Sequence, residues 1–113
     1  MTDREDVREA VAAAVAAMPV IQGTALRIFG RYDRDQALLW FLEELGELVA
    51  ALRKGKSEAE VQGELADVLV WALCLTNILQ KDAASVLEHA FSKEIERQER
   101  VYGRLKYWES FGE

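Results

Sequence analysis

The chain has few of the residues that form cross-links or soft-metal sites. Its 113 residues include one cysteine, one histidine and one proline. A single cysteine excludes an internal disulfide and a thiolate metal cluster, and Cys74 is interpreted as a buried apolar residue because its sequence neighbours are apolar. His89 is interpreted as structural or exposed, because Val86 stands where the Glu-x-x-His motif of di-iron bundles needs a glutamate.

Positive charge is also scarce. The 14 lysines and arginines face 20 aspartates and glutamates, which leaves a net charge of −6. This balance argues against binding a nucleic-acid polymer, but a metal can still bridge acidic side chains and the phosphates of a nucleotide. No run reaches the roughly 18 uninterrupted apolar residues of a membrane span, and the acidic start MTDREDVRE lacks the basic end of a signal peptide. We therefore expect a cytoplasmic protein that does not bind a membrane.

Helix-forming residues, above all Ala, Leu and Glu, dominate the chain, and β-branched runs are rare. The length suits one domain that would gain from oligomerisation. We predict an all-α fold: a four-to-five-helix bundle with an antiparallel central helix pair. In the second helix, Ile28 and Phe29 are expected to face inward. Helices are expected over residues 2–17, 20–30, 34–53, 57–80 and 82–102, within a single domain over 1–113 that comprises an N-terminal helical segment (1–33), motif-bearing helices (34–102) and a tail (103–113).

Two pairs of acidic residues interrupt apolar helical runs. Glu44 and Glu47 stand in LLWFLEELGELVAAL, and Glu64 and Asp67 stand in ELADVLVWALCL. Residues three apart share one face of a helix, and like charges on a buried face are costly unless a cation compensates for them. No lysine or arginine follows any of the four at the i+4 position, as it would on an ordinary solvated helix. The pattern favours a metal site over the alternative, a solvated acidic face.

Each acidic pair extends into a longer stripe that includes a tryptophan. The stripes are Trp40, Glu43, Glu44 and Glu47 on one helix, and Glu60, Glu64, Asp67 and Trp71 on the next. A short turn at Gly55 makes these helices an antiparallel pair, so the two stripes can face one another. We expect a cluster of four or five carboxylates with an indole at each end, and we expect small Gly46 and Ala66 to allow close approach of the helices.

The chemistry of the acids narrows the metal to a hard cation. Carboxylates without histidine or cysteine favour Mg²⁺, Mn²⁺ or Ca²⁺, and such ions suit phosphate-bearing substrates. The segments LEELGELVAAL and GELADVLVWALCLTN, with a short spacer between them, resemble the MazG-like all-α nucleoside triphosphate pyrophosphohydrolases over about residues 38–100. This resemblance implies Mg²⁺-dependent cleavage, with Mn²⁺ as a substitute, between the α- and β-phosphates. It also implies a nucleoside triphosphate substrate and a homodimer or a tetramer made of dimers.

The resemblance assigns roles to individual residues. It implies that Glu44, Glu47, Glu64 and Asp67 are the metal ligands. It also places Lys93 and Arg97, in SKEIERQER, in the stretch of the last helix that meets the phosphates. Arg97 stands where several members of the family have asparagine, and the alternative for both cations is pairing with the glutamates around them.

Several roles stay open on the sequence. Glu43, Glu44 and Glu47 are the catalytic candidates for taking the proton from an attacking water. Trp71 and Trp40 are candidates for base stacking, against the alternative of core packing. Asn77 is equally suited to contact a sugar or base and to make a capping or interface hydrogen bond. Two other functions remain: a non-catalytic metal-binding interaction module, and a pyrophosphohydrolase of a non-nucleotide substrate.

Overall fold

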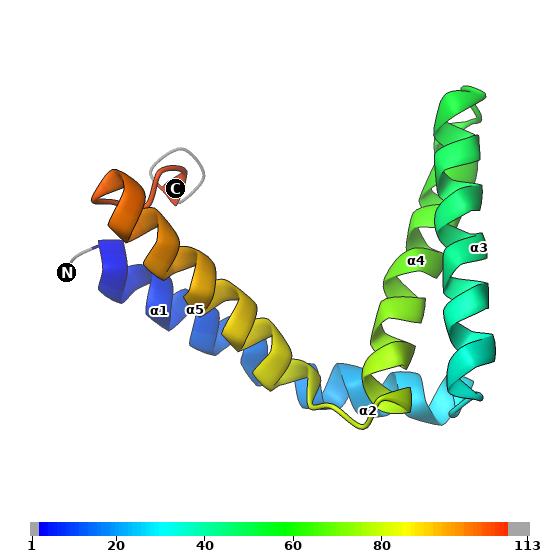
Figure 1. The fold of residues 1–113 in the computed structure, drawn as a ribbon, viewed down its shortest axis with the longest axis horizontal. Coiled ribbons are helices and arrows are strands. Elements are labelled where there is room, and N and C mark those ends of the chain that lie inside the picture. The colour runs from blue at the N-terminus through cyan, green and yellow to red at the C-terminus, as the bar shows by residue number, and fades with distance from the viewer. Residues whose placement is uncertain (1–2, 109–113) are drawn as a thin grey trace. The chain divides into compact units, whose positions relative to one another are not determined.

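The computed structural model describes residues 3–108, with side chains from residue 5 onward, and this part of the chain contains five α-helices and no strand. The prediction of an all-α fold is therefore confirmed, while the start of the first predicted helix at residue 2 and residues 109–113 of the predicted tail lie outside the described residues. The helices are α1 (Asp3–Ala16), α2 (Met18–Phe29), α3 (Arg34–Arg53), α4 (Glu58–Ile78) and α5 (Ala83–Tyr102), coloured along the chain in Figure 1.

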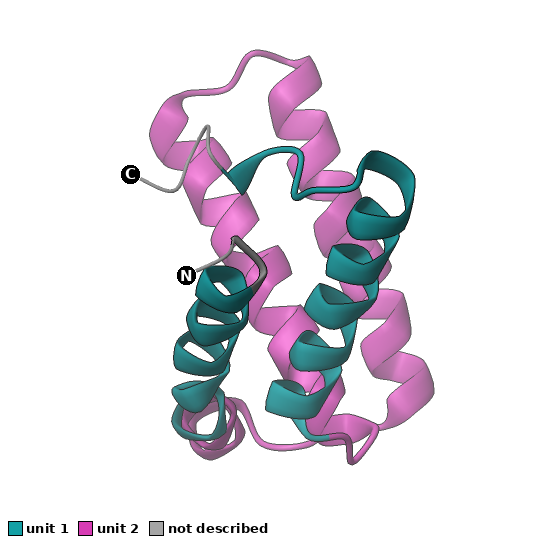
Figure 2. Cartoon of the chain, turned by 90° about the vertical axis from the view of Figure 1, so that its left-hand side faces the viewer, with its two compact units in different colours: residues 1–20, 82–113 teal, residues 21–81 magenta. Residues whose placement is uncertain are grey.

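The chain divides into two compact units. Unit 1 comprises residues 1–20 and 82–113 and unit 2 comprises residues 21–81, as the two colours of Figure 2 show. In unit 1, α1 packs against α5, and in unit 2, α3 packs against α4. The chain turns back between α3 and α4, so they form the predicted antiparallel pair (Figure 1). The prediction of one domain over residues 1–113 stays a prediction.

Side-chain caps explain where the central helices begin. The carboxylate of Asp33 accepts a hydrogen bond from the N–H of Gln36 at 3.2 Å and caps α3. The hydroxyl of Ser57 accepts from the N–H of Glu60 at 3.2 Å, and it donates to the Glu60 carboxylate at the same distance. These two bonds form a capping box, and a cap of this kind stabilises a helix by about 1 kcal/mol.

The two central helices end in the same way with different residues. At the end of α3, Gly55 adopts a left-handed φ of 63°, and Lys56 N–H donates to the Ala51 carbonyl at 3.0 Å. At the end of α4, Gln80 adopts φ 56°, and Lys81 N–H donates to Thr76 O at 2.8 Å. Both are Schellman motifs. Helix α4 therefore ends two residues before the predicted boundary, because glutamine in place of glycine hides the stop signal.

Helix α2 is tied to the end of α4 through polar side chains. Pro19 is the second residue of α2, where a missing N–H leaves no helical hydrogen bond unmade. Asn77 is buried and donates its side-chain amide to the Gln22 carbonyl at 3.2 Å, and Gln22 donates its own amide to the Lys81 carbonyl at 2.7 Å. The structure thus shows a hydrogen bond between α4 and α2 for Asn77, and its contact with a sugar or base stays a prediction.

The expectation that Ile28 and Phe29 face inward is wrong. Ile28 is 68% exposed and Phe29 is 39% exposed, whereas the small Ala25 is the buried residue of α2. Gly30, with φ 70°, then ends the helix. A short helix that buries only a small residue can leave its large apolar side chains on the other faces.

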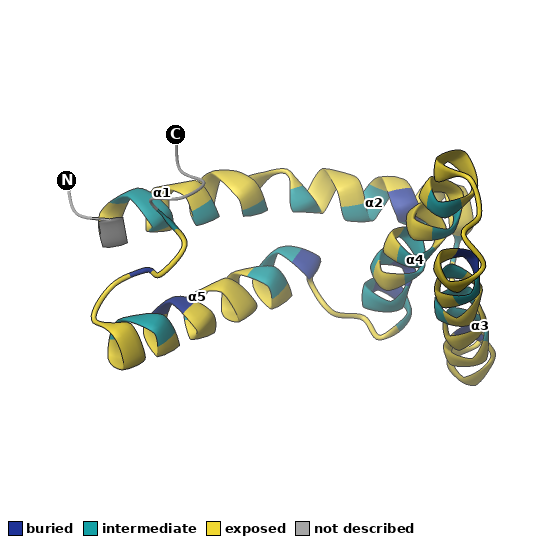
Figure 3. Cartoon of the chain, turned by 90° about the horizontal axis from the view of Figure 1, so that it is seen from above, coloured by how far each residue is buried: buried dark blue, intermediate teal, exposed yellow. Residues whose placement is uncertain are grey.

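Unit 2 leaves one side of its helix pair apolar. The packing face of α3 runs through Ala37, Glu44 and Ala51, seven residues apart, and both alanines are buried. At about 100° per residue, the residues that follow each packing-face residue by one and by five positions lie together on one flank of the helix. Because α3 and α4 are antiparallel, the corresponding flank of α4 points to the same side of the pair as that of α3. The apolar side of unit 2 comprises Leu38, Leu42, Val49 and Leu52 of α3 with Leu65 and Leu69 of α4, which are 41–63% exposed. Figure 3 colours much of both helices as exposed.

Two stretches are long and apolar enough to cross a membrane by length and composition alone. They are Glu5–Phe29 and Glu58–Ile78. Core helices of soluble proteins and signal sequences meet the same criterion. The finding differs from the expectation drawn from uninterrupted apolar runs, because an average over a whole helix tolerates isolated charges.

Candidate metal centre

Three glutamates meet between the central helices of unit 2. Glu44 and Glu47 of α3 and Glu64 of α4 each offer one carboxylate oxygen, and these three oxygens lie within 4.8 Å of one another. Glu44 and Glu64 are half-buried, and Glu47 is exposed. The structure thus brings together three of the four predicted metal ligands, from two separate helices.

Asp67 and Glu43 lie outside this group of three. Asp67 is exposed on α4, one turn after Glu64, and its charge contributes to the raised pKa of both Glu44 and Glu64. It is therefore an electrostatic neighbour of the site. Glu43 is exposed on α3. Its catalytic role stays a prediction, as does that of Asp67 as a ligand.

Burial and mutual repulsion disfavour the ionised form of two of these acids. Burial raises the pKa of the Glu44 carboxyl, and the charges of Glu47, Asp67 and Glu64 raise it further. Burial is also the first cause of the raised pKa of Glu64, followed by the carboxylate of Glu47. Glu47 therefore stands between two acids that gain from a shared proton or a bound cation.

The oxygen atoms of the site fit a hard divalent cation. Among the described residues, Oε2 of Glu44 and Oε2 of Glu64 are buried and have no hydrogen-bond partner. A buried carboxylate oxygen without a donor is costly unless a cation contacts it. The three grouped residues offer only carboxylate oxygens, the ligand type that Mg²⁺ and Mn²⁺ prefer. The donor set and the two orphan oxygens together match the predicted kind of metal.

The expectation of an indole at each end of the acid cluster is wrong. The rings of Trp40 and Trp71 contact each other edge to face, with centroids 5.7 Å apart. Trp40 precedes Glu44 on α3, and Trp71 follows Asp67 on α4. Because the helices run in opposite directions, these positions fall at the same end of the cluster.

Tyr32 joins the two indoles and was missed by the sequence reasoning. Its ring centroid lies 5.4 Å from that of Trp40 and 5.6 Å from that of Trp71. Tyr32 precedes the helix in the segment before the cap of α3, so helical periodicity does not connect it with the stripe. The only signal available was an aromatic residue directly beside a helix cap. We call Tyr32, Trp40 and Trp71 the aromatic cluster.

The expected role of Gly46 and Ala66 in close helix approach is also wrong. A β-carbon added at Gly46 would meet no atom within 4 Å, and Ala66 is exposed. Each lies two positions after a glutamate of the packing face, which rotates it by about 200° away from the partner helix. These small residues face outward.

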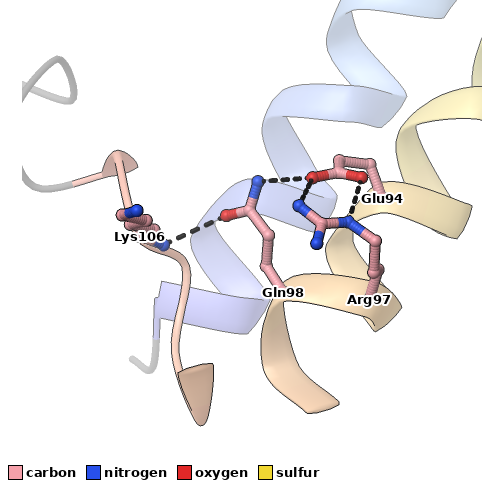
Figure 4. A network of polar contacts seen from close by, with 4 residues as sticks. All are labelled: Glu94, Arg97, Gln98 and Lys106. Atoms are coloured by element: carbon pink, nitrogen blue, oxygen red, sulfur yellow. Dashed lines mark hydrogen bonds and ion pairs between the residues drawn. The ribbon is translucent and has the colours of Figure 1, made fainter. Parts of the chain in front are cut away.

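The two predicted phosphate-binding cations lie on α5 in unit 1. Arg97 forms a bidentate pair with Glu94, with both N···O distances 2.7 Å, and Glu94 also accepts from the Gln98 amide at 2.9 Å (Figure 4). These hydrogen bonds hold the pKa of Glu94 down to about 2. The structure shows local ion pairing for Arg97, while Lys93 is exposed. Phosphate contact by Lys93 and Arg97 stays a prediction.

The same polar network fixes the segment after α5. The side-chain oxygen of Gln98 accepts the Lys106 N–H at 3.0 Å (Figure 4). The Lys106 ammonium lies 4.8 Å from the centre of the Tyr102 ring. This segment borders a cavity of about 430 Å³ in unit 1, lined mainly by apolar side chains of α1, α5 and residues 105–108. The network of Glu94 and Arg97 therefore helps to hold the segment after α5, independently of any contact with a phosphate.

Comparison with known families agrees with the geometry of unit 2. The family model described as MazG nucleotide pyrophosphohydrolase domain matches residues 33–102. This match spans α3, α4 and α5 and contains all four predicted metal ligands. No curated protein and no solved structure matches the chain.

Proposed function

Because the chain belongs to the MazG nucleotide pyrophosphohydrolase domain family, we propose that it is a Mg²⁺-dependent hydrolase of nucleoside triphosphates. It cleaves between the α- and β-phosphates and releases a nucleoside monophosphate and pyrophosphate, a reaction suited to cleansing the nucleotide pool. The observation that carries this proposal is the meeting of Glu44, Glu47 and Glu64 within 4.8 Å, with two buried oxygens that lack a partner.

Glu44, Glu47 and Glu64, with Asp67 beside them, would hold the metal, with Mn²⁺ as a substitute for Mg²⁺. When bound, the metal neutralises phosphate charge and polarises the α-phosphate for attack. The chain itself must accept a proton from the attacking water. Glu47 is the exposed member of the three and is best placed to meet a water from solvent, with Glu43 and Glu44 as the other candidates.

Other residues of the family region bind the remainder of the substrate in this proposal. Lys93 and Arg97 contact the phosphates as charged donors, which for Arg97 requires exchange of its pair with Glu94. The base stacks at the aromatic cluster, to which the predicted candidates Trp71 and Trp40 both belong. The substrate is a free nucleotide rather than a nucleic-acid polymer, in keeping with the net charge of −6.

The apolar side of unit 2 supports an oligomer. Six large apolar side chains, 41–63% exposed, lie together on one side of a helix pair, and large exposed apolar patches mark interaction sites. We propose a homodimer or a tetramer made of dimers, working in the cytoplasm without membrane contact.

Pyrophosphate release from a panel of canonical and modified nucleoside triphosphates with Mg²⁺ tests the function. Glu47→Ala and Asp67→Ala should each lower kcat/KM by at least about 100-fold, because each removes charge that compensates the metal. Glu88→Ala, at an exposed acid of α5, is the matched control and should retain activity. Helical content measured by circular dichroism must be unchanged in all three variants.

The two other functions give different results in the same assay. A non-catalytic interaction module would bind Mg²⁺ but release no pyrophosphate from any nucleotide. A pyrophosphohydrolase of a non-nucleotide substrate would be inactive on the nucleotide panel and active on phosphoribosyl pyrophosphate compounds. Turnover of a nucleotide that depends on Glu47 excludes the first.

A further inference from the structure

We propose that Tyr32 supplies the ring on which the nucleobase stacks, while the two indoles behind it hold that ring in place. This inference rests on the proposed nucleotide hydrolase function and deepens it, because it separates the aromatic side chain that meets the substrate from those that support it. It also defines the substrate by its base as well as by its phosphates.

The exposures within the aromatic cluster distinguish the three rings. Tyr32 is 39% exposed, whereas Trp40 and Trp71 both fall below it, in the half-buried range. The Tyr32 ring is tilted by 35° over Trp71 and meets Trp40 at 79°. Tyr32 therefore covers part of the indole surface that a base would otherwise use, and as a residue it is more exposed to solvent than either tryptophan.

The backbone on both sides of Tyr32 is fixed. Gly30 ends α2 with φ 70°, and its N–H donates to the Leu26 carbonyl at 2.8 Å. Asp33 caps α3 through its bond to Gln36. Tyr32 thus lies in a connection of a few residues, anchored at both ends and backed by two indoles. A ring held in this way loses little conformational freedom when a base stacks on it.

The position of the cluster matches the layout of a nucleotide. Trp40 lies one helical turn before Glu44, and Trp71 lies one turn after Asp67, so each indole is about 6 Å along its helix axis from an acid. Tyr32 is in contact with both indoles. A triphosphate held at the acids places its sugar along the indoles and its base at Tyr32.

Stacking on one exposed ring predicts a particular selectivity. Every nucleobase has a π-face, so such a platform accepts purines and pyrimidines alike and contributes about 1–3 kcal/mol. A phosphate chain without a base gains nothing from it. The aromatic cluster therefore commits the site to base-bearing substrates, which sets it apart from a hydrolase of non-nucleotide pyrophosphates.

Calorimetric titration tests this without relying on turnover. The probes are α,β-methylene-ATP and inorganic tripolyphosphate, each with Mg²⁺. Tyr32→Leu keeps an apolar side chain and removes the ring; it should weaken binding of the methylene nucleotide about 10-fold or more and leave tripolyphosphate affinity unchanged. Tyr32→Phe should restore nucleotide affinity. Tyr107→Leu is the matched control, since it removes another exposed tyrosine from unit 1.

The outcomes separate this inference from the proposed function. Equal loss for both probes, or loss for neither, overturns the role of Tyr32. If the wild type releases pyrophosphate and Tyr32→Leu leaves KM unchanged, the function stands and the stacking platform fails. If the wild type shows no turnover but binds the nucleotide in a Tyr32-dependent way, the platform stands and the hydrolase function fails. Thermal unfolding of each variant identifies any loss of fold, and a change in stability alone with both affinities intact counts against the proposal.

Discussion

At the scale of single residues, the geometry that would let the acid cluster bind a cation also disfavours the metal-free folded state. Glu44 and Glu64 each bury one oxygen without a donor, and the pKa of each carboxyl is raised first by burial and then by neighbouring acids. Without a cation, the folded protein holds these mutually repelling carboxyl groups close together at neutral pH. The site would therefore destabilise the metal-free fold, and a bound cation would raise the stability of the folded protein.

The sign of the pH dependence follows from these two groups. Because their pKa values are raised in the folded state, the folded protein holds more protons than the unfolded protein between the ordinary value of 4.5 and neutrality. These acids therefore do not lower the free energy of unfolding below pH 4.5, and they lower it increasingly as the pH rises. Thermal unfolding in EDTA should show it, and added Mg²⁺ should raise Tm more at pH 7 than at pH 5.

Glu44→Gln tests this at one residue. Without metal at pH 7 it should raise Tm by a few degrees, because it removes one charge from the cluster, and it should remove most of the Mg²⁺-dependent gain in Tm. Differential scanning calorimetry with EDTA or Mg²⁺ measures both effects, with Glu88→Gln as the control. A lower Tm in EDTA would mean that Glu44 makes a stabilising local contact instead.

The residues of the site differ in how far the sequence could predict them. The acids were found because i, i+3 spacing on one helix is a local property. The positions of the indoles were predicted wrongly. The two helices run in opposite directions, so the tryptophan before the acids on α3 and the tryptophan after the acids on α4 lie at the same end of the cluster. Tyr32 was missed because a residue in a connection has no periodicity that aims its side chain.

At the scale of helices, boundaries follow caps rather than apolar periodicity. Ser57 and Glu60 mark the start of α4, Gly55 marks the end of α3, and Gly103 marks the end of α5, so these boundaries could be predicted closely. The end of α4 could not, since Gln80 uses a conformation that the sequence usually announces with glycine. A left-handed non-glycine residue costs about 1 kcal/mol or more.

Gln80→Gly should therefore stabilise the protein. Glycine adopts the φ of 56° without the β-carbon clash and should raise the free energy of unfolding by about 1 kcal/mol. Gly55→Ala is the matched opposite: at φ 63° it should lower that free energy by a similar amount. Urea denaturation followed by circular dichroism measures both. A destabilised Gln80→Gly would show that the glutamine side chain contributes more than its backbone strain costs.

At the scale of the whole molecule, helix composition is enough to predict an all-α chain but not what covers its apolar surfaces. The leucines of α3 and α4 recur with helical spacing, which predicts the helix and is silent on the partner. In unit 2, Ala37, Ala51 and the acids lie on the face where α3 and α4 pack together. The exposed leucines and Val49 lie on the apolar side next to it. The proposed oligomer would remove this flank from water.

Leu42→Glu with Leu69→Glu tests the assembly. Charges on the apolar side of unit 2 should convert the wild-type oligomer to a smaller species in sedimentation velocity, because buried unpaired carboxylates oppose association. Ile28→Glu, at a residue of unit 2 that is 68% exposed outside that side, is the control and should leave the sedimentation coefficient unchanged. A wild type that sediments as a monomer at micromolar concentration would contradict the assembly.

The hairpin of α3 and α4 also restricts how this chain can change in length. Glu47 lies eight residues before Gly55, and Glu64 lies nine residues after it, so the acids meet because both arms are nearly equal. An insertion of four residues in one arm would slide its acids by about 6 Å and separate the carboxylates. The same insertion in both arms, or extra residues in the turn itself, would leave them in register. Insertions and deletions compatible with the site are therefore confined to the turn or occur in matched pairs.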